Sequence, residues 1–320
     1  MTKVVFLDYD STSRNDLDLS QLEASCTSLT TWPQTKQADL ISHIADAEII
    51  ISNKVIIDAE LLEKLQHQIK LICVAATGTN NIDLDAAKHF KIPVTNVRNY
   101  ASQSVAEHSI GLLFTLSRQI AAYQQAVARG DWARSHNFCL LDCPITEIAG
   151  KTLAIIGYGN LGQATTRLAK AVGMNVMIAE RAGTDEIREG RVSLDTLFNE
   201  ADIISLHCPL DETTRDLVDA KRLQQMKPSA FLINTARGGI VNEADLLEAL
   251  KRGDIAGAAI DTLEQEPPTK DSILLSEQLP NLIISPHVAW ASQNARQTLL
   301  NQLADIISGW QRGELINRVV

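Results

Sequence analysis

The 320-residue sequence has no apolar run that approaches the ~20 residues needed to cross a bilayer. Its first residues, Met1 to Asp8, become acidic too early to form a secretory signal. The first absence argues against an integral membrane protein. Together the two absences lead us to expect a cytoplasmic protein.

Positively charged residues are fewer than negatively charged ones. Lys and Arg number 29 against 39 Asp and Glu, which gives a formal net charge of -10, and the acidic residues are spread through the chain. A surface of this sign does not attract nucleic acid or anionic lipid. We therefore expect neither of them as a partner.

Cysteine is sparse, with five residues scattered along the chain. Cys73 and Cys208 lie in strand-like runs and are expected to be core thiols. Cys139 and Cys143 have the spacing of half a metal site, but no second Cys or His pair in the sequence completes it. We expect reduced thiols and no bound metal.

The stretch 151–180 carries the strongest pattern. An apolar run at 152–156 predicts a buried strand, 163–172 has helical spacing, and 175–179 predicts a second strand. The order is strand, glycine-rich turn, helix, strand and acid. This order is typical of dinucleotide-binding βαβ units.

Three glycines and one acid in this stretch have separate tasks. Gly157 permits a tight turn, Gly159 leaves room for a pyrophosphate beside the backbone, and Gly162 lets the helix pack closely on the strand. Free N–H groups at the start of the helix attract phosphate. Glu180, roughly 20 residues further on, is placed to accept a hydrogen bond from a ribose hydroxyl.

Strand-like and helical segments alternate along the chain. Strands are predicted at 4–7, 48–52, 70–75, 92–97, 152–156, 175–179, 202–207, 230–235, 255–260 and 282–285, and helices at 38–45, 58–65, 84–89, 102–129 and 292–310. This alternation predicts an α/β protein with parallel sheets covered on both faces.

The order of the segments predicts two domains. The six strands from 152 onward fit a doubly wound Rossmann domain at 101–286, whose sheet is complete before the last helix begins. We expect that helix to return to the first unit. Residues 1–100 plus 287–320 would then form a smaller, discontinuous, flavodoxin-like substrate domain.

The segment 130–144 is irregular but apolar, with Trp132, Phe138 and the pair Leu140 and Leu141. Two interpretations are open at this point. The segment either packs on its own domain or is buried by a partner subunit.

Three residues after the glycine turn could carry chemistry. Arg237 directly follows a predicted strand, and a guanidinium there can bind a carboxylate through two hydrogen bonds. His287 follows the last strand, and imidazole is well suited to proton transfer near neutral pH. Glu266 lies in an acidic loop and alone reads as a solvated charge; paired with His287, it would hold the imidazole ready to donate.

These segments together resemble the D-isomer-specific 2-hydroxyacid dehydrogenases over essentially the whole chain. The matching segments are 76–83, 105–108, 157–162, 207–210, 234–239, 259–261, 264–268 and 286–287. Within the family, segments 75–81, 179–181 and 287–290 are most similar to the branch that interconverts hydroxypyruvate and D-glycerate.

The resemblance implies an NAD-dependent oxidoreductase whose catalytic residues are Arg237, Glu266 and His287, with His287 as proton donor or acceptor. It implies that Thr77, Gly78, Arg237 and His287 bind the substrate. The implied cofactor contacts are Thr77, Gly157, Gly159, Asn160, Leu161, Gly162, Glu180, His207, Cys208, Pro209, Thr235, Ala236, Asp261 and Ala289. It also implies a homodimer formed through the dinucleotide-binding domain.

Alternatives remain for both the reaction and the cofactor. The protein could instead reduce glyoxylate or another small 2-oxoacid, or it could be a non-enzymatic protein that binds NAD(H) and recruits partners. Glu180 should repel the 2′-phosphate of NADP(H), whereas Arg181 could attract it. We expect NAD(H) to be preferred, with NADP(H) as the alternative.

Overall fold

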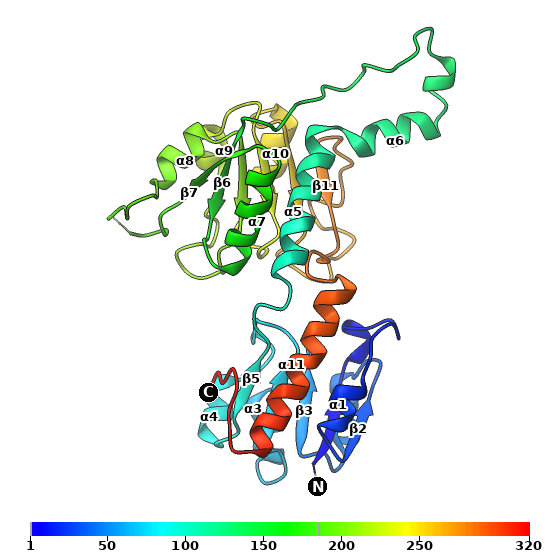
Figure 1. Cartoon of the computed structure of the whole chain (residues 1–320), viewed down its shortest axis with the longest axis vertical. Helices are drawn as coiled ribbons and strands as arrows, with labels where there is room; N and C mark the ends of the chain where they lie inside the picture. The colour runs from blue at the N-terminus through cyan, green and yellow to red at the C-terminus, as the bar shows by residue number, and fades with distance from the viewer. Residues whose placement is uncertain (1, 185) are drawn as a thin grey trace. The chain divides into compact units, whose positions relative to one another are not determined.

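The computed structural model describes residues 2–184 and 186–320 and contains two compact units. One unit consists of Met1–Ala101 and Ala291–Val320, and the other of Ser102–Trp290. Each unit has its own parallel β-sheet with helices packed against it (Figure 1). The expected α/β class with two parallel sheets is confirmed.

The first unit has a five-stranded sheet in the order β2-β1-β3-β4-β5, the flavodoxin-like order. Its strands are β1 (Lys3–Phe6), β2 (Ser28–Thr31), β3 (Ile49–Ser52), β4 (Leu71–Val74) and β5 (Val94–Asn96). Its helices are α1 (Ser20–Ala24), α2 (Leu40–Ile44), α3 (Ala59–Leu65), α4 (Leu84–His89) and α11 (Gln293–Gln311), with short 3₁₀ turns η1 (Tyr9–Ser11) and η2 (Gln37–Asp39).

Alternation along the strands of this sheet produces two buried faces. Val5, Ile50 and Ile72 share one core with α2, α3 and α4. Helix α11 packs against α1 on the other side of the sheet (Figure 1). The last helix therefore belongs to the first unit, although more than 180 residues of the second unit separate it from the other helices.

The second unit has a six-stranded sheet in the order β11-β10-β9-β8-β6-β7. Its strands are β6 (Thr152–Ile156), β7 (Asn175–Ile178), β8 (Ile203–Leu206), β9 (Phe231–Asn234), β10 (Gly257–Ile260) and β11 (Leu282–Ile284). A parallel bridge between Ala179 and Val192 adds a single residue pair beyond β7. With this vestigial strand beside β7, the order is that of a doubly wound dinucleotide-binding sheet.

Helices cover both faces of this second sheet. They are α5 (Ser102–Ser117), α7 (Asn160–Ala171), α8 (Leu194–Glu200), α9 (Ala220–Gln225) and α10 (Glu243–Arg252). Leu153 and Ile155 pack with α5 and α7. Ala154 and Ile156 pack on the opposite face with α8, α9 and α10.

One expectation about secondary structure is wrong, and one strand was not predicted. The single helix predicted at 102–129 is two helices, α5 and α6 (Ile120–Ala128), because Gln119 adopts a left-handed conformation with φ of 54° between them. Strand β2 was not predicted. Its sequence, Ser28-Leu-Thr-Thr31, lies at the sheet edge and is largely exposed, so it has no alternating apolar pattern.

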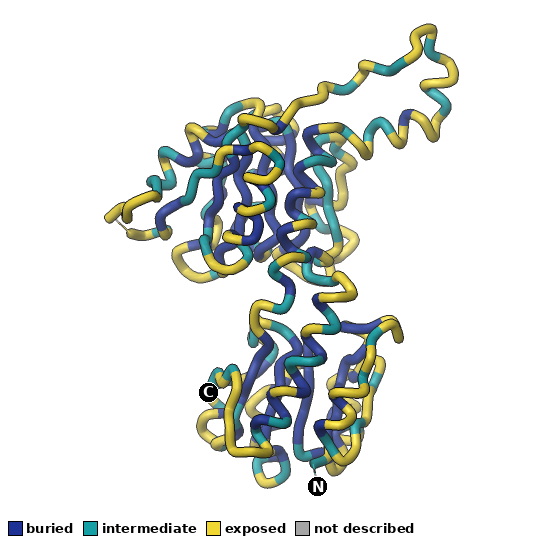
Figure 2. The backbone as a smooth tube through the Cα atoms, in the orientation of Figure 1, coloured by how far each residue is buried: buried dark blue, intermediate teal, exposed yellow. Residues whose placement is uncertain are grey.

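Helix α6, the 3₁₀ turn η3 (Trp132–Arg134) and the segment to Cys143 form an arm whose path is mostly exposed (Figures 1 and 2). The Phe138 and Leu141 side chains are 91% and 80% exposed. Packing of this arm on its own domain, one of the two interpretations above, is therefore wrong.

Candidate active site

The glycine-rich turn lies between β6 and α7, and two of its glycines are required by close backbone approach. A Cβ on Gly157, whose φ is 93°, would lie 2.5 Å from the backbone nitrogen of Cys208. A Cβ on Gly162 would lie 2.2 Å from the carbonyl oxygen of Gly157. The turn, the helix and the end of β8 are thus packed against one another without room for side chains.

The third glycine faces open space. No atom lies within 4 Å of a Cβ built on Gly159, which is the N-cap of the 12-residue helix α7. Glycine has no side chain with which to cap the helix, and the first turn of α7 contains no acid. The dipole of the helix therefore favours an anion at this end, which fits the pyrophosphate of a dinucleotide.

Residues that follow the neighbouring strands lie at the same end of the sheet. Cys208 and Pro209 follow β8, and Thr235 and Ala236 follow β9. His207 is buried, and its Nε2 lies 2.9 Å from Ser205 Oγ. Burial lowers the pKa of His207 to about 4, so this histidine is neutral at physiological pH and unsuited to donate a proton.

Glu180 follows β7, and its side chain is only 3% exposed. Its carboxylate accepts hydrogen bonds from the Arg188 guanidinium and from the backbone N–H groups of Arg181 and Arg188. The Arg188 guanidinium, more than the backbone bonds, holds the pKa of Glu180 well below its usual range. The sequence led us to expect a carboxylate open to a ribose; instead it is already paired.

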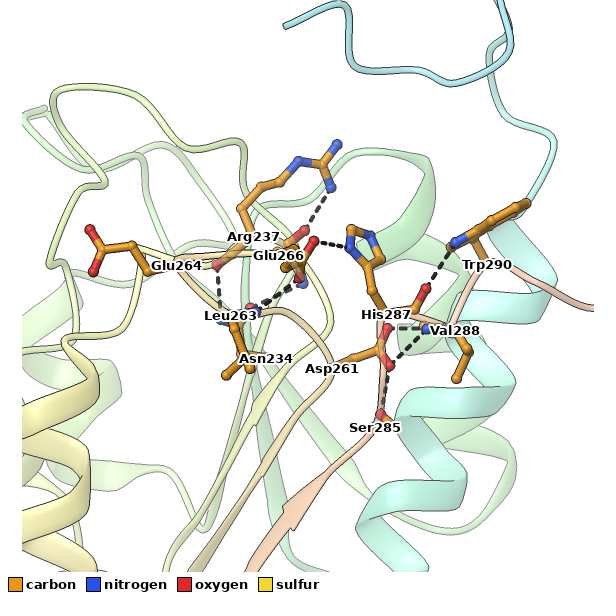
Figure 3. A network of polar contacts seen from close by, with 12 residues as sticks. Asn234, Arg237, Asp261, Leu263, Glu264, Glu266, Ser285, His287, Val288 and Trp290 are labelled. Carbon is orange, nitrogen blue, oxygen red and sulfur yellow. Dashed lines mark hydrogen bonds and ion pairs between the residues drawn. The ribbon is translucent and has the colours of Figure 1, made fainter. Parts of the chain in front are cut away.

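Arg237, Glu266 and His287 follow three adjacent strands, β9, β10 and β11, and all three side chains lie at the carboxyl end of the sheet (Figure 3). His287 Nδ1 lies 2.6 Å from Glu266 Oε2. The other carboxylate oxygen of Glu266 accepts a hydrogen bond of 2.9 Å from the backbone N–H of Leu263. Glu266, which by itself read as a solvated charge, is therefore the partner of His287.

Arg237 is held close to this pair by its backbone. The Asn234 side-chain amide donates to the Arg237 carbonyl at 2.9 Å, and Arg237 Nη1 donates to the Ala236 carbonyl at 2.6 Å. The next residue, Gly238, packs so tightly on the Glu266 loop that a Cβ would lie 1.9 Å from the Leu263 carbonyl oxygen. This glycine keeps the arginine turn in contact with the loop that carries the glutamate.

Asp261 fixes the turn that presents His287. Its buried carboxylate accepts hydrogen bonds from Ser285 Oγ at 2.6 Å and from the backbone N–H groups of Val288 and Ala289 at 3.0 and 2.9 Å (Figure 3). The Asp261 carbonyl accepts from the His287 backbone N–H at 2.8 Å. These bonds stabilise the positive φ of 53° at His287, a conformation that non-glycine residues seldom adopt.

Helix α5 supports the same turn through two contacts that no sequence motif indicates. Ser104 Oγ donates to the Ala289 carbonyl at 2.7 Å, and His108 Nε2 lies 3.1 Å from Ser285 Oγ. These partners are 185 and 177 residues apart in the chain, so no local pattern could indicate the contact.

Thr77 and Gly78, expected to contact substrate, belong to the first unit and follow β4. The buried side chain of Asn96 donates to the Thr77 carbonyl at 2.7 Å, and Thr77 Oγ1 donates to the Val97 carbonyl at 3.0 Å. The loop is thus held in one backbone conformation at the carboxyl edge of the first sheet.

Neither a metal cluster nor a membrane-spanning helix was found in the described part of the chain. Its histidines, cysteines and acids form no group of three or more that could hold a metal ion. Its helices include none long and apolar enough to cross a bilayer.

Residues 110–289 match the family described as "D-isomer specific 2-hydroxyacid dehydrogenase, NAD binding domain". The chain is 45% identical over 317 residues to glycerate dehydrogenase of Methylorubrum extorquens, with 99% of this chain and 98% of that relative covered. Two solved structures are similar as well. D-lactate dehydrogenase with NAD+ from Lactobacillus jensenii has a TM-score of 0.82 at 28% identity and covers 100% and 99% of the two chains. An acyclic imino acid reductase in complex with NADPH and D-Arg has a TM-score of 0.84 at 27% identity and covers 100% of each chain.

Proposed function

The chain belongs to the D-isomer-specific 2-hydroxyacid dehydrogenases, and we propose that within this family it reduces hydroxypyruvate to D-glycerate with NADH, reversibly. The observation that carries the proposal is the hydrogen bond between His287 and Glu266 beside Arg237. The likeness to a glycerate dehydrogenase along nearly the whole chain supports this choice of substrate.

His287 and Glu266 supply the proton in this proposal. Bound NADH supplies the hydride that reaches the carbonyl carbon. With Glu266 accepting from Nδ1–H of His287, Nε2 is the nitrogen that gives its proton to the carbonyl oxygen. The carboxylate balances the positive charge of the ring before the proton leaves. In the reverse direction, the neutral Nε2 takes the proton from the hydroxyl group.

Arg237 binds the carboxylate of the oxoacid in this proposal. A guanidinium can hold a carboxylate through two parallel hydrogen bonds and so fix its orientation. Thr77 and Gly78 are the proposed substrate contacts of the first unit. We assign the substrate domain to that unit and the dinucleotide-binding domain to the second. The boundary expected between 286 and 287 lies after Trp290, so His287 belongs to the second unit.

The cofactor site consists of the turn with Gly157, Gly159 and Gly162 and the strand ends around it. The other proposed contacts of the second unit are Asn160, Leu161, His207, Cys208, Pro209, Thr235, Ala236, Asp261 and Ala289. Thr77 is the proposed contact of the first unit. Glu180 serves the adenosine ribose and favours NAD(H) over NADP(H) through charge repulsion.

The exposed arm supports a homodimer formed through the dinucleotide-binding domain. Phe138 and Leu141 present apolar surface that the arm's own unit does not cover. Replacing both with serine should shift the protein from dimer to monomer in sedimentation velocity. All five cysteines are free thiols, which agrees with a reducing compartment such as the cytoplasm.

A substrate panel tests the proposal. NADH oxidation is measured with hydroxypyruvate, glyoxylate, pyruvate and longer 2-oxoacids, and the highest kcat/KM is expected with hydroxypyruvate. A higher value for glyoxylate would move the assignment to a glyoxylate reductase. Binding of NADH without oxidation by any 2-oxoacid would instead identify a non-enzymatic NAD(H)-binding protein.

A further inference from the structure

The carboxylate of Glu180 is fully engaged within its own chain. Oε2 accepts from the Nε–H of Arg188 at 2.8 Å and from the Arg188 backbone N–H at 3.0 Å. Oε1 accepts from the Arg181 backbone N–H at 2.8 Å and from Arg188 Nη2. A ribose hydroxyl can therefore gain this carboxylate only by displacing one of its present donors.

The loop that carries Arg188 is closed at its base by the sheet. Glu180 N donates to the Val192 carbonyl at 2.8 Å, and Val192 N donates to the Ile178 carbonyl at 2.9 Å. These two bonds form the vestigial strand beside β7, so the chain leaves Glu180 and returns next to it. The contact between Glu180 and Arg188 thus follows from the sheet and is more than a chance surface pair.

Glu180 and Arg188 together present a different charge distribution to a ligand than an isolated carboxylate would. The Glu180 side chain is 3% exposed, whereas that of Arg188 is 48% exposed. A guanidinium has more N–H groups than the two that contact Glu180, so it can bind a second anion while the first pair persists. The positive charge of Arg188, in contact with Glu180, also reduces the electrostatic repulsion between Glu180 and a phosphate group.

We propose that Arg188 determines how this protein discriminates between NADH and NADPH. Its guanidinium competes with the ribose hydroxyls of NADH for Glu180, and it offers a partner to the 2′-phosphate of NADPH. This inference rests on the proposed function, in which Glu180 faces the adenosine ribose. It replaces Arg181, the residue the sequence favoured, as the source of NADP(H) tolerance.

The neighbouring arginines are placed differently. Arg181 contacts Glu180 through its backbone N–H, which does not depend on the side chain. Arg191 Nη1 donates to the Ala179 carbonyl at 3.1 Å, and its guanidinium lies 5.9 Å from the Tyr158 ring centre. Two acids of the loop, Glu186 and Glu189, are exposed, and solvent and salt screen their charges.

Nucleotide fragments that lack nicotinamide test the inference apart from catalysis. Isothermal titration would compare ADP with 2′,5′-ADP in the wild-type protein and in the variants Arg188→Gln, Arg188→Lys and Arg181→Gln. We expect Arg188→Gln to weaken 2′,5′-ADP binding about tenfold relative to ADP, because one charge-assisted contact is lost. Arg188→Lys should lose less, because it keeps the positive charge.

Arg181→Gln is the matched control, since it removes the same charge from the same loop. It should change the ratio of the two affinities by less than about threefold, the effect of a screened surface charge. Kinetics with NADH and NADPH should follow the same order, with the ratio of kcat/KM shifting toward NADH in Arg188→Gln.

The outcomes separate the inference from the function on which it rests. An equal loss of ADP and 2′,5′-ADP in Arg188→Gln, or a larger shift of their ratio in Arg181→Gln, would overturn the role of Arg188 while leaving the enzyme assignment intact. A wild-type protein that binds neither nucleotide would overturn both. Circular dichroism of each variant verifies that the fold is preserved.

Discussion

The two sheets of the protein end their first strands in different ways. In the second unit, β6 runs into Gly157, and helix α7, whose N-cap is Gly159, follows. In the first unit, β1 runs toward the buried acid Asp8, whose carboxylate accepts from the backbone N–H groups of Asn53 at 2.9 Å and Lys54 at 2.7 Å. At this edge of the first sheet, a carboxylate of the protein itself thus binds the backbone N–H groups of Asn53 and Lys54.

This difference shows that a parallel α/β sheet does not determine its own ligand. Both units place loops at the carboxyl ends of parallel strands, the usual location of binding sites. In the second unit the first turn of α7 contains no acid, whereas the first unit supplies an internal anion, the Asp8 carboxylate. Gly157 directly after β6 and Asp8 two residues after β1 thus give the two sheet edges different preferences for an added anion.

The largest effect is expected from removing the proton donor of the second unit. His287→Ala should lower kcat for the oxoacid by roughly 10²- to 10⁴-fold, the usual contribution of general acid catalysis. NADH binding, measured by nicotinamide fluorescence, should stay close to that of the wild type. Near-normal turnover in this variant would eliminate His287 as the proton donor.

A second variant tests substrate binding. Arg237→Ala should raise KM for the oxoacid by about 10²-fold, because a carboxylate loses a charge-assisted partner. KM for NADH should change much less. Equal increases in both values, measured by steady-state kinetics, would mean that Arg237 supports the fold of the site and does not bind the oxoacid.

The tight packing at Gly162 can be tested by comparison with Gly111, where an added Cβ would meet no other atom within 4 Å. Gly162→Ala should destabilise the protein by about 1–3 kcal/mol and weaken NADH binding, because the new Cβ would lie 2.2 Å from the Gly157 carbonyl oxygen. Gly111→Ala in α5, with nothing within 4 Å of the Cβ, is the control and should be neutral or slightly stabilising. Urea unfolding and NADH titration measure both effects.

Cofactor preference should respond to the loss of the ribose acid. Glu180→Ser should lower the NADH to NADPH ratio of kcat/KM by about tenfold, because repulsion of the 2′-phosphate is lost while Arg188 remains. An unchanged ratio would count against the assignment of Glu180 to the adenosine ribose.

The smallest effect concerns Asp8 of the first unit. Burial raises the pKa of Asp8 above its ordinary value of 3.8, against the opposing backbone hydrogen bonds. The protonated form of Asp8 therefore contributes its full stabilisation at pH values below 3.8. This contribution to the free energy of unfolding is lost as the pH rises through the raised pKa. Asp8→Asn cannot titrate, so its free energy of unfolding should fall less than that of the wild type over this range.

Urea unfolding at several pH values between about 4 and 6 measures the two slopes. Asp10→Asn, which removes an exposed acid two residues further on, is the control and should follow the wild type. If Asp8→Asn also follows the wild type, the titration of Asp8 does not contribute to stability in this range.

Much of the fold could be predicted because its signals are local. The runs at 152–156, 175–179 and 282–285 are strands β6, β7 and β11 to within one residue at each end. Buried parallel strands are nearly continuous apolar runs, so their positions are plain in the sequence. The break at Gln119 was missed because apolar spacing continues from α5 into α6 and no glycine or proline marks the turn.

The candidate site could be predicted only in part. Arg237 and His287 were expected at strand ends and lie there, because the chemistry of each residue type and its place after a strand are both local properties. Taken alone, Glu266 was interpreted as a solvated charge, and Glu180 was expected to accept a hydrogen bond from a ribose hydroxyl, with no sign of Arg188 as its partner. Both expectations depended on neighbours that local spacing does not specify.

The sequence by itself determined where the strands other than β2 lie, which turn could accept a dinucleotide, and which side chains could transfer a proton or bind a carboxylate. Only the tertiary structure decided the pairing of the charged groups. Glu180 meets Arg188 across 8 residues, Glu266 meets His287 across 21, and Asp261 meets Val288 across 27. The physical reason is that strand order and loop closure bring these groups together, whereas secondary structure depends on residues only a few positions apart.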